Sequence, residues 1–153
     1  MLFRMQSVKH NMKSIWFRND LTVEELQSLS SGTMAEYLQM KWEEIGSDFL
    51  RMSMPVSDHV RQPYGLLHGG ASCALAETIG SVGSHLIIDP EAFSCVGMEI
   101  NANHVRSIKQ GIVYAIAKPL HVGRTSHIWD IRISNERNQL LCISRLTVAV
   151  IGK

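Results

Sequence analysis

Cysteine is scarce in this 153-residue sequence and follows no pairing pattern. Cys73, Cys95 and Cys142 are scattered, and no Cys-x-x-Cys pair occurs. This usage excludes a disulfide framework and offers no zinc-ligand spacing. Each of the three falls in an apolar run, so we expect small buried hydrophobic residues in a reducing, cytoplasmic setting.

The chain also lacks a strong excess of either charge. Fifteen Lys and Arg residues stand against 14 Asp and Glu residues, which gives a formal net charge of +1. Nucleic-acid-binding domains usually show a strong basic bias, so nucleic acid is not an expected partner. No run of about 20 apolar residues occurs, so the chain is not expected to cross a membrane.

The first 20 residues lack the features of a signal peptide. They carry four Lys and Arg residues before Asp20, without an unbroken apolar core or a small-residue cleavage site. We expect residues 1–20 to be an N-terminal extension, with 1–11 poorly ordered unless a neighbouring subunit holds them. Residues 21–153, in a chain that is 45% hydrophobic, should form a single domain.

Short motifs predict the first elements of this domain. Two capping boxes, Thr22 with Glu25 and Thr33 with Glu36, predict short helices. The stretch LQMKWEEIGSDFLRMSMPV contains two extended runs joined by GSD, which indicates a hairpin. Residues 57–67, with Pro63 and Gly65, should be irregular.

Residues 64–88, YGLLHGGASCALAETIGSVGSHLII, predict a long helix. An apolar stripe at helical spacing comprises Leu75, Ile79, Val82 and Leu86. A second stripe of small and polar residues comprises Gly70, Glu77, Ser81 and Ser84. The helix is therefore expected to have a core face and a separate small-and-polar face.

Four strand-like runs follow this helix, at residues 93–106, 111–121, 126–134 and 140–151. Their connections are too short for helices, so the sheet should be mostly antiparallel. The expected fold class is α+β, with one antiparallel sheet packed on one long helix. Such a sheet leaves edge strands and an exposed face, which favours dimerisation.

Glu77 is the single Asp, Glu, Lys or Arg residue between Arg61 and Asp89. It could be an ordinary exposed residue on the solvent side of the helix. A solvent face normally carries several charges, however. The small residues around this acid favour a packed interface or a cleft wall, where a carboxylate needs hydrogen-bond donors or water.

Gly69 and Gly70 lie where the helix should begin. Unpaired amides at a helix start can polarise a carbonyl oxygen or hold an anion, although glycines there can also serve a tight turn. With Glu77, the pattern suggests an oxyanion donor facing a carboxylate nucleophile or base. Glu77 lies about 10 Å along the helix from Gly70. A symmetric dimer would resolve this, with the acid and the glycine turn coming from different subunits.

Other candidate residues leave their alternatives open. Gln62 could bond a substrate carbonyl or satisfy its own loop, and His68 could be structural or catalytic. Ser72 is not in a Gly-x-Ser-x-Gly elbow. The seven histidines show no metal-ligand spacing, so no metal or other cofactor is expected. Basic residues on strand ends could form a phosphate site or a solvated surface.

The runs QPYGLLHGGASCALAETIGS, GMEINANHVR and CISRLTVAVI resemble the hotdog-fold acyl-CoA thioesterases. The likeness covers residues 12–153. It is strongest to the branch that includes the 1,4-dihydroxy-2-naphthoyl-CoA thioesterases of menaquinone synthesis and the glutamate-using 4-hydroxybenzoyl-CoA thioesterases. The resemblance implies a sheet wrapped around the long helix, assembled into dimers and commonly tetramers.

The resemblance also implies roles for particular residues. Glu77 would attack the thioester carbonyl or activate water, and the Gly69 N–H would polarise that carbonyl. Gln62 and His68 match positions that orient the thioester, and Ser81 matches one that places water or the carboxylate. The implied substrate-binding positions are Gly70, Thr78, His104, Arg106 and Arg124. Thr78 stands where relatives have serine, and the stretch HVGRTSHIW departs from their pattern around Arg124.

The sequence thus predicts a cytoplasmic, cofactor-free thioesterase that hydrolyses an aromatic acyl-CoA. One alternative is a thioesterase that acts on acyl groups carried by a carrier protein, as in proofreading. Another is a non-catalytic acyl-CoA-binding module.

Overall fold

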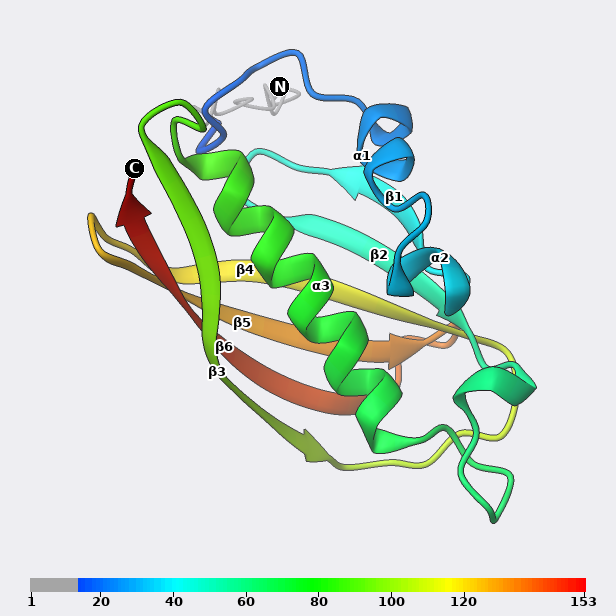
Figure 1. The fold of residues 1–153 in the computed structure, drawn as a ribbon. Coiled ribbons are helices and arrows are strands. Elements are labelled where there is room, and N and C mark those ends of the chain that lie inside the picture. The colour runs from blue at the N-terminus through cyan, green and yellow to red at the C-terminus, as the bar shows by residue number, and fades with distance from the viewer. Residues whose placement is uncertain (1–13) are drawn as a thin grey trace, which may run out of the picture.

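A computed structural model describes residues 14–153, so the expectation for residues 1–11 lies outside the described part. Two short helices come first, α1 (Val23–Leu29) and α2 (Met34–Tyr37). The hairpin β1 (Lys41–Ile45) and β2 (Leu50–Pro55) follows, then a 3₁₀ turn (Asp58–Val60) and the long helix α3 (Gly69–Ile87). Four strands complete the fold: β3 (Phe93–His104), β4 (Ile112–Val122), β5 (Ser126–Asn135) and β6 (Leu140–Gly152) (Figure 1).

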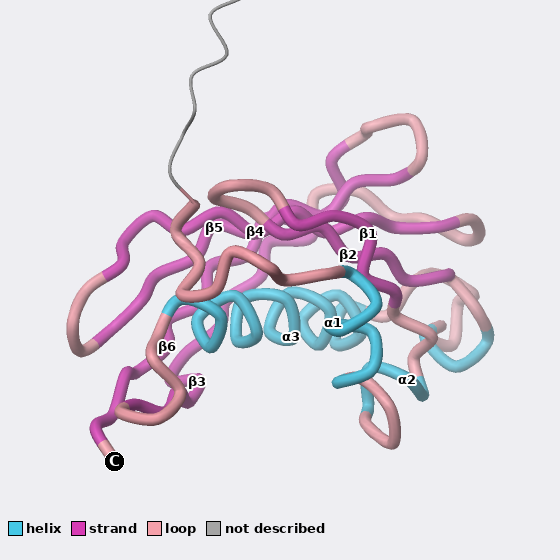
Figure 2. The backbone as a smooth tube through the Cα atoms, turned by 90° about the horizontal axis from the view of Figure 1, so that it is seen from above, coloured by secondary structure: helices cyan, strands magenta, loops and turns pink. Residues whose placement is uncertain are grey.

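The strands form a six-stranded antiparallel sheet in the order β1-β2-β4-β5-β6-β3. Helix α3 lies across one face, and the sheet curls around it (Figures 1 and 2). The predicted α+β architecture is confirmed, with the strand boundaries within two residues of those expected. The helix begins at Gly69, where the glycine pair predicted its start, and residues 62–68 form a tight loop before it.

Close packing against the sheet depends on small residues in α3. A methyl group added at Gly80 would lie 2.6 Å from Leu146 Cδ2, and one at Gly83 would lie 2.7 Å from the Trp129 ring. Beside them, the Trp129 indole N–H donates to Ser84 Oγ at 2.8 Å, and both side chains are buried. The indole thus fills the space above two glycines and satisfies its polar atom there.

The two expected stripes of α3 are only partly present. Leu75, Ile79 and Leu86 are buried, but Val82 is half-exposed. The expectation of one continuous small-and-polar face is wrong, because Ser84 is 0% exposed while Glu77 is exposed. Different strands pack against different turns of α3, so two residues on the same side of the helix can differ in exposure.

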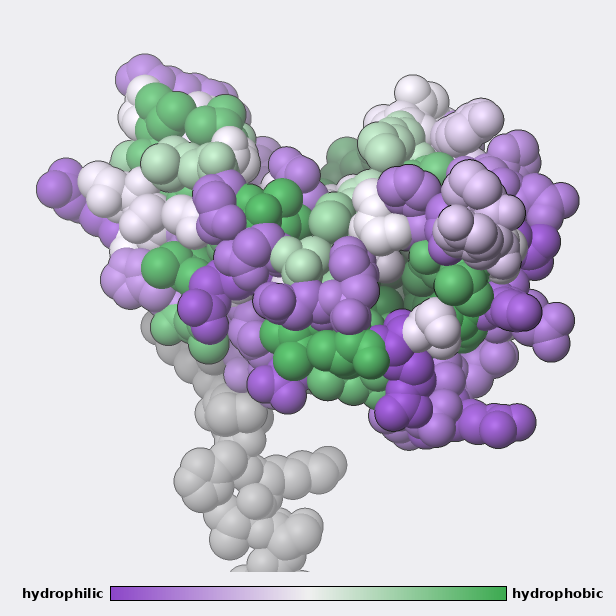
Figure 3. Space-filling view, turned by 90° about the horizontal axis from the view of Figure 1, so that it is seen from below, coloured by the Kyte–Doolittle hydropathy of each residue, from purple (hydrophilic) through white to green (hydrophobic). Residues whose placement is uncertain are grey.

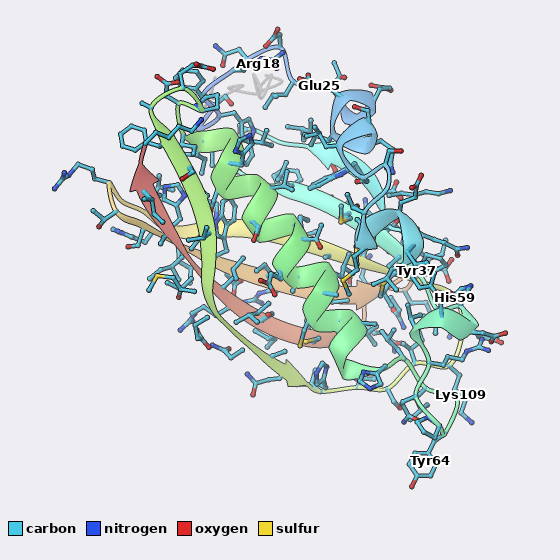
Figure 4. The ribbon with its side chains drawn as sticks, viewed as in Figure 1. Arg18, Glu25, Tyr37, His59, Tyr64 and Lys109 are labelled. Carbon is cyan, nitrogen blue, oxygen red and sulfur yellow. The ribbon has the colours of Figure 1, made fainter. Side chains whose placement is uncertain are left out.

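The helix-start motifs are half right. The Glu25 N–H donates to Thr22 Oγ1 at 3.1 Å, as a capping box requires. The Glu25 carboxylate, however, accepts from Arg18 at 2.6 Å instead of returning to Thr22 (Figure 4). The Thr33 hydroxyl does not cap α2, contrary to expectation. It donates to the Ser30 carbonyl at 2.6 Å, an acceptor offered by the preceding turn.

Part of the expected extension, residues 14–20, packs on the domain. Trp16 is 6% exposed, and its indole N–H donates to the Gly46 carbonyl at 2.6 Å. The Phe17 N–H donates to the Leu86 carbonyl at 2.8 Å, which covers the C-terminal end of α3. This segment therefore satisfies one of the carbonyls that every helix end leaves unpaired.

The cysteines divide in burial. Cys142 is buried, and this burial, with the nearby Cys73 sulfur, raises the pKa of its thiol to about 11. Burial also raises the pKa of Cys95, although Cys95 and Cys73 are only half-buried. The expectation of a buried hydrophobic residue holds fully for Cys142 alone among the three.

No helix within residues 14–153 is both long enough and apolar enough to span a membrane.

Candidate active site

The start of α3 leaves one particular amide without an acceptor. The N-cap is His68, whose Nδ1 accepts from the Gly70 N–H at 2.8 Å. The His68 carbonyl accepts from the Ala71 and Ser72 N–H groups at 3.0 and 3.3 Å. No acceptor for the Gly69 N–H occurs within residues 14–153. His68 therefore satisfies the first turn and leaves Gly69 as the available donor.

A cavity of about 380 Å³ opens beside this amide. Four of the expected site residues line it together: Gln62, Gly69, His104 and Arg106. Ser72 also lines it, among apolar side chains that include Leu66, Leu67, Ile108 and Leu141. Apolar walls with a few convergent polar groups are typical of a small-molecule site.

The loop that precedes α3 fixes Gln62 at the cavity. The Gln62 carbonyl accepts from the Gly65 N–H at 2.9 Å, and Gly65 has a φ of +76°, which favours glycine. The Gln62 Oε1 accepts from the Tyr64 N–H within the same turn. The loop thus uses the oxygen of this side-chain amide and leaves its NH₂ group to donate. Tyr64 itself points into solvent at the loop tip (Figure 4).

His104 ends strand β3 directly beside the helix start. A methyl group added at Gly69 would lie 2.8 Å from His104 Nε2, so these two residues are in close contact. The next residues leave the strand, and the Arg106 N–H donates to the Leu141 carbonyl at 3.3 Å. The C-terminal end of β3 and the N-terminal end of α3 therefore form adjacent walls of the cavity.

Glu77 lies away from this cavity and does not line it. The helix rises about 12 Å between Gly69 and Glu77. The Glu77 side chain is exposed and lies against β3, where a methyl group added at Gly97 would sit 3.0 Å from its Oε1. One protomer therefore does not bring the acid and the free amide to one point.

The remaining expected residues are dispersed. Ser81 is half-buried, one turn beyond Glu77. Thr78 lines a second cavity of about 260 Å³ between α1, α2 and α3, together with Leu29, Met34 and Val82. Gly70 is exposed, with its N–H bonded to His68. Arg124 is exposed in the β4–β5 turn. Strand β4 begins at the end of the sheet where α3 begins, so its far end places Arg124 at the opposite end of the sheet from Gly69 (Figure 1).

Sequence reasoning missed Gly97. The pairing of β3 with β6 shifts register between Gly97 and Glu99, so Met98 is an extra residue in a β-bulge. A glycine inside a strand pattern, here in CVGMEI, is the available signal for a bulge or a close approach.

The family model described as the thioesterase superfamily matches residues 64–142. The 1,4-dihydroxy-2-naphthoyl-CoA hydrolase of Escherichia coli (strain K12) is 47% identical over 137 residues, covering 90% of this chain and 99% of that protein. The proofreading thioesterase EntH of Cronobacter sakazakii is 45% identical over 138 residues, covering 90% and 99%.

Solved structures agree with these relatives. The crystal structure of a mutant of thioesterase PA1618 from Pseudomonas aeruginosa has a TM-score of 0.89 and 41% identity, covering 92% of this chain and 100% of that one. Thioesterase HI1161 from Haemophilus influenzae has a TM-score of 0.86 and 42% identity, covering 90% and 95%. This chain therefore belongs to the thioesterase superfamily and is an enzyme with the hotdog fold.

Proposed function

We propose that this thioesterase hydrolyses an aromatic acyl-CoA to the free acid and CoA at a site shared between two copies of the chain. One observation carries the proposal. The unpaired Gly69 N–H faces a cavity lined by Gln62, His104 and Arg106, while the expected carboxylate of Glu77 points elsewhere.

The residues have complementary chemical roles. The Gly69 N–H, at the positive end of α3, donates to the thioester oxygen and stabilises the charge that develops there. Glu77 attacks the carbonyl carbon or removes a proton from water, and Ser81 holds that water or the carboxylate. The free NH₂ of Gln62 orients the thioester, and His68 keeps the helix start in shape through its bond to Gly70.

Strand β3 offers the surface for the second copy. It is an edge strand that pairs only with β6 among the described strands. Its exposed side chains include the apolar Val96 and Met98, at 50% and 67% exposure. The space-filling view from below also shows a hollow between two lobes, with apolar side chains on both (Figure 3). A long edge with exposed apolar residues favours pairing with another chain.

Pairing along β3 would also assemble the site. Glu77 lies beside Gly97, and Gly69 lies beside His104, seven residues further along the same strand. In a two-fold antiparallel pair centred on Asn101, His104 of one copy would stand opposite the bulge formed by Gly97 and Met98 of the other. Glu77 of each copy would then face Gly69 of its partner.

The ends of the substrate take separate parts of this surface. His104 and Arg106, which line the cavity with Gly69, would contact the CoA portion of the substrate next to the thioester. Thr78, next to Glu77 in sequence, opens onto the smaller cavity between α1, α2 and α3, which suits the acyl group. Gly70 belongs to the turn that frames the thioester, and Arg124 would join the site only from another copy.

The activity is tested with a panel of acyl-CoA thioesters, comparing kcat/KM for each member. Aromatic acyl-CoA should be preferred over aliphatic acyl-CoA, and Glu77→Gln and Glu77→Ala should lose turnover. The second candidate substrate is an acyl group attached to a carrier protein, the alternative that the sequence left open. One relative is named a proofreading thioesterase. Higher kcat/KM for holo-carrier thioesters would favour the carrier-bound substrate. Full turnover in both Glu77 variants would overturn the role of the acid.

Shared sites can be tested by mixing two inactive variants. Gly69→Pro removes the free N–H, and the extended backbone of His68 (ψ 133°) accepts a following proline. A mixed dimer of Glu77→Gln and Gly69→Pro subunits would have one doubly defective site and one intact site. Random pairing should restore about a quarter of wild-type activity. If the co-expressed variants recover no activity, the Glu77 carboxylate and the Gly69 N–H of each site come from one subunit, and the shared site is refuted.

A further inference from the structure

Gly97 is in contact with the expected catalytic acid without taking part in the chemistry described so far. The carbon of a methyl group added at Gly97 would lie only 3.0 Å from Glu77 Oε1, which is shorter than an ordinary van der Waals contact. Glu77 lies on α3 and Gly97 on β3, so two separate elements meet at this point. Any side chain at position 97 would therefore displace the carboxylate.

The strand is irregular at the same place. The ladder between β3 and β6 pairs Gly97 with Val148 and Glu99 with Thr147, which leaves Met98 as the extra residue of a bulge. A bulge bends its strand and re-aims the neighbouring residues, and glycine in a strand often marks a close approach. The bulge and the missing side chain therefore occur where an added Cβ would meet Glu77.

We propose that Gly97 is a positioning residue, whose missing side chain leaves the Glu77 carboxylate room to adopt its reactive orientation. The inference rests on the proposed function, because it assumes that Glu77 carries the hydrolysis. The backbone of β3 limits the carboxylate on one side, and the bulge sets how far that backbone stands from α3. An added methyl group would push Oε1 by a few tenths of an ångström or turn the side chain away.

A small displacement of this kind should affect the rate more than the fold. The flexible, exposed end of Glu77 can move aside at little cost in stability. Misplacement of a reacting group by 1 Å can cost a factor of about 100 in rate, so a smaller shift should cost about tenfold. Gly97→Ala should therefore lower kcat by about tenfold with little change in KM, and Gly97→Val should lower it further.

A matched control is present in the neighbouring strand. Gly152 in β6 has no atom within 4 Å of an added methyl group, so Gly152→Ala makes the same chemical change without a contact. We expect Gly152→Ala to keep wild-type kcat, and both alanine variants to keep the wild-type unfolding midpoint and oligomeric state. Wild-type kcat for Gly97→Ala would overturn the proposal. Loss of the oligomer in Gly97→Ala would do so too, since Gly97 would then serve assembly.

A double-mutant cycle isolates the contact between the two residues. Glu77→Asp shortens the side chain by one methylene and withdraws the carboxylate from Gly97. In that background, Gly97→Ala should lower kcat by less than about threefold, because the clash is relieved. An equal loss in both backgrounds would overturn the proposal. Full turnover by Glu77→Gln would instead refute the proposed function, whatever Gly97→Ala does.

Discussion

Glu77 and Ser84 are seven residues apart on α3, within about 20° of the same angular position, yet they meet opposite surroundings. Ser84 is fully buried and accepts from Trp129 of β5 at 2.8 Å. Glu77 is exposed and lies against Gly97 of the edge strand β3. The strand that each residue meets, more than its place on the helical wheel, determines whether it serves packing or is available for chemistry.

Substitutions at the two positions should therefore affect different properties of the enzyme, turnover near Glu77 and stability near Ser84. Substitutions near Glu77 should change turnover with little effect on stability, because the side chains there have room and few partners. Substitutions near Ser84 should change stability with little effect on turnover, because polar atoms there are buried and paired. Measuring both quantities for each variant tests the separation.

The largest effect is expected for Glu77→Gln. Loss of a general base or nucleophile should lower kcat by about 10²–10⁴-fold, equivalent to roughly 3–5 kcal/mol in the barrier. The free energy of unfolding should change by less than about 0.5 kcal/mol, because the side chain is exposed. Steady-state kinetics and urea denaturation measure the two. A large loss of stability in this variant would remove the contrast with Ser84.

The next effect is expected at the free amide. Gly69→Pro removes the N–H that has no acceptor within the described residues, and kcat should fall by about 10²–10³-fold. Gly69→Ala is the matched control, because it keeps the N–H but adds the same Cβ against His104. We expect the alanine variant to retain most of the activity that proline loses. Equal losses would assign the effect to the contact with His104 instead.

Ser84→Ala should show the opposite balance. It leaves the buried Trp129 indole N–H unpaired, so unfolding should become easier by about 1–3 kcal/mol. The kcat of the folded enzyme should stay at the wild-type value. Ser81→Ala, on the half-buried side one turn beyond Glu77, should instead lower kcat and keep stability within about 0.5 kcal/mol. Thermal unfolding of both variants beside their kinetics would show whether the two serines differ.

Much of the fold could be predicted because its signals are local. Alternation in Trp129, Ile131 and Ile133, which are all buried, gave β5 its inward face. The capping interaction of Thr22 depends only on residues three apart. The hairpin of β1 and β2 likewise follows from its short turn.

The site was harder to predict because it depends on contacts between distant segments. Gly97 and Glu77 meet only after β3 has folded back along α3, so their spacing in sequence gives no signal. Ser84 fits the period of Glu77 but is buried by Trp129, 45 residues later. The helix-start glycines were recognisable, but the capping of Gly70 by His68, which leaves Gly69 free, depends on side-chain geometry.

The smallest predicted effect is on the pH dependence of stability, through a buried histidine on β5. His127 of β5 is 1% exposed, and its Nδ1 has no partner among the described residues. Burial, with a smaller contribution from the His121 charge, lowers the pKa of His127 below 6.5. The unfolded chain therefore binds this proton more readily than the native protein, so stability should fall as pH drops below about 6.5. For one group the slope is at most about 1.4 kcal/mol per pH unit.

His127→Leu removes this titration and keeps an apolar side chain in the core. The free energy of unfolding should therefore depend less on pH between about 7 and 5 than in the wild type, while kcat at neutral pH stays the same. His121→Gln removes only the second contribution and should flatten the curve less. Parallel pH curves for wild type and His127→Leu would show that the buried imidazole is not part of the linkage. A pH-dependent change in kcat specific to His127→Leu would show that the packed face also contributes to the chemistry.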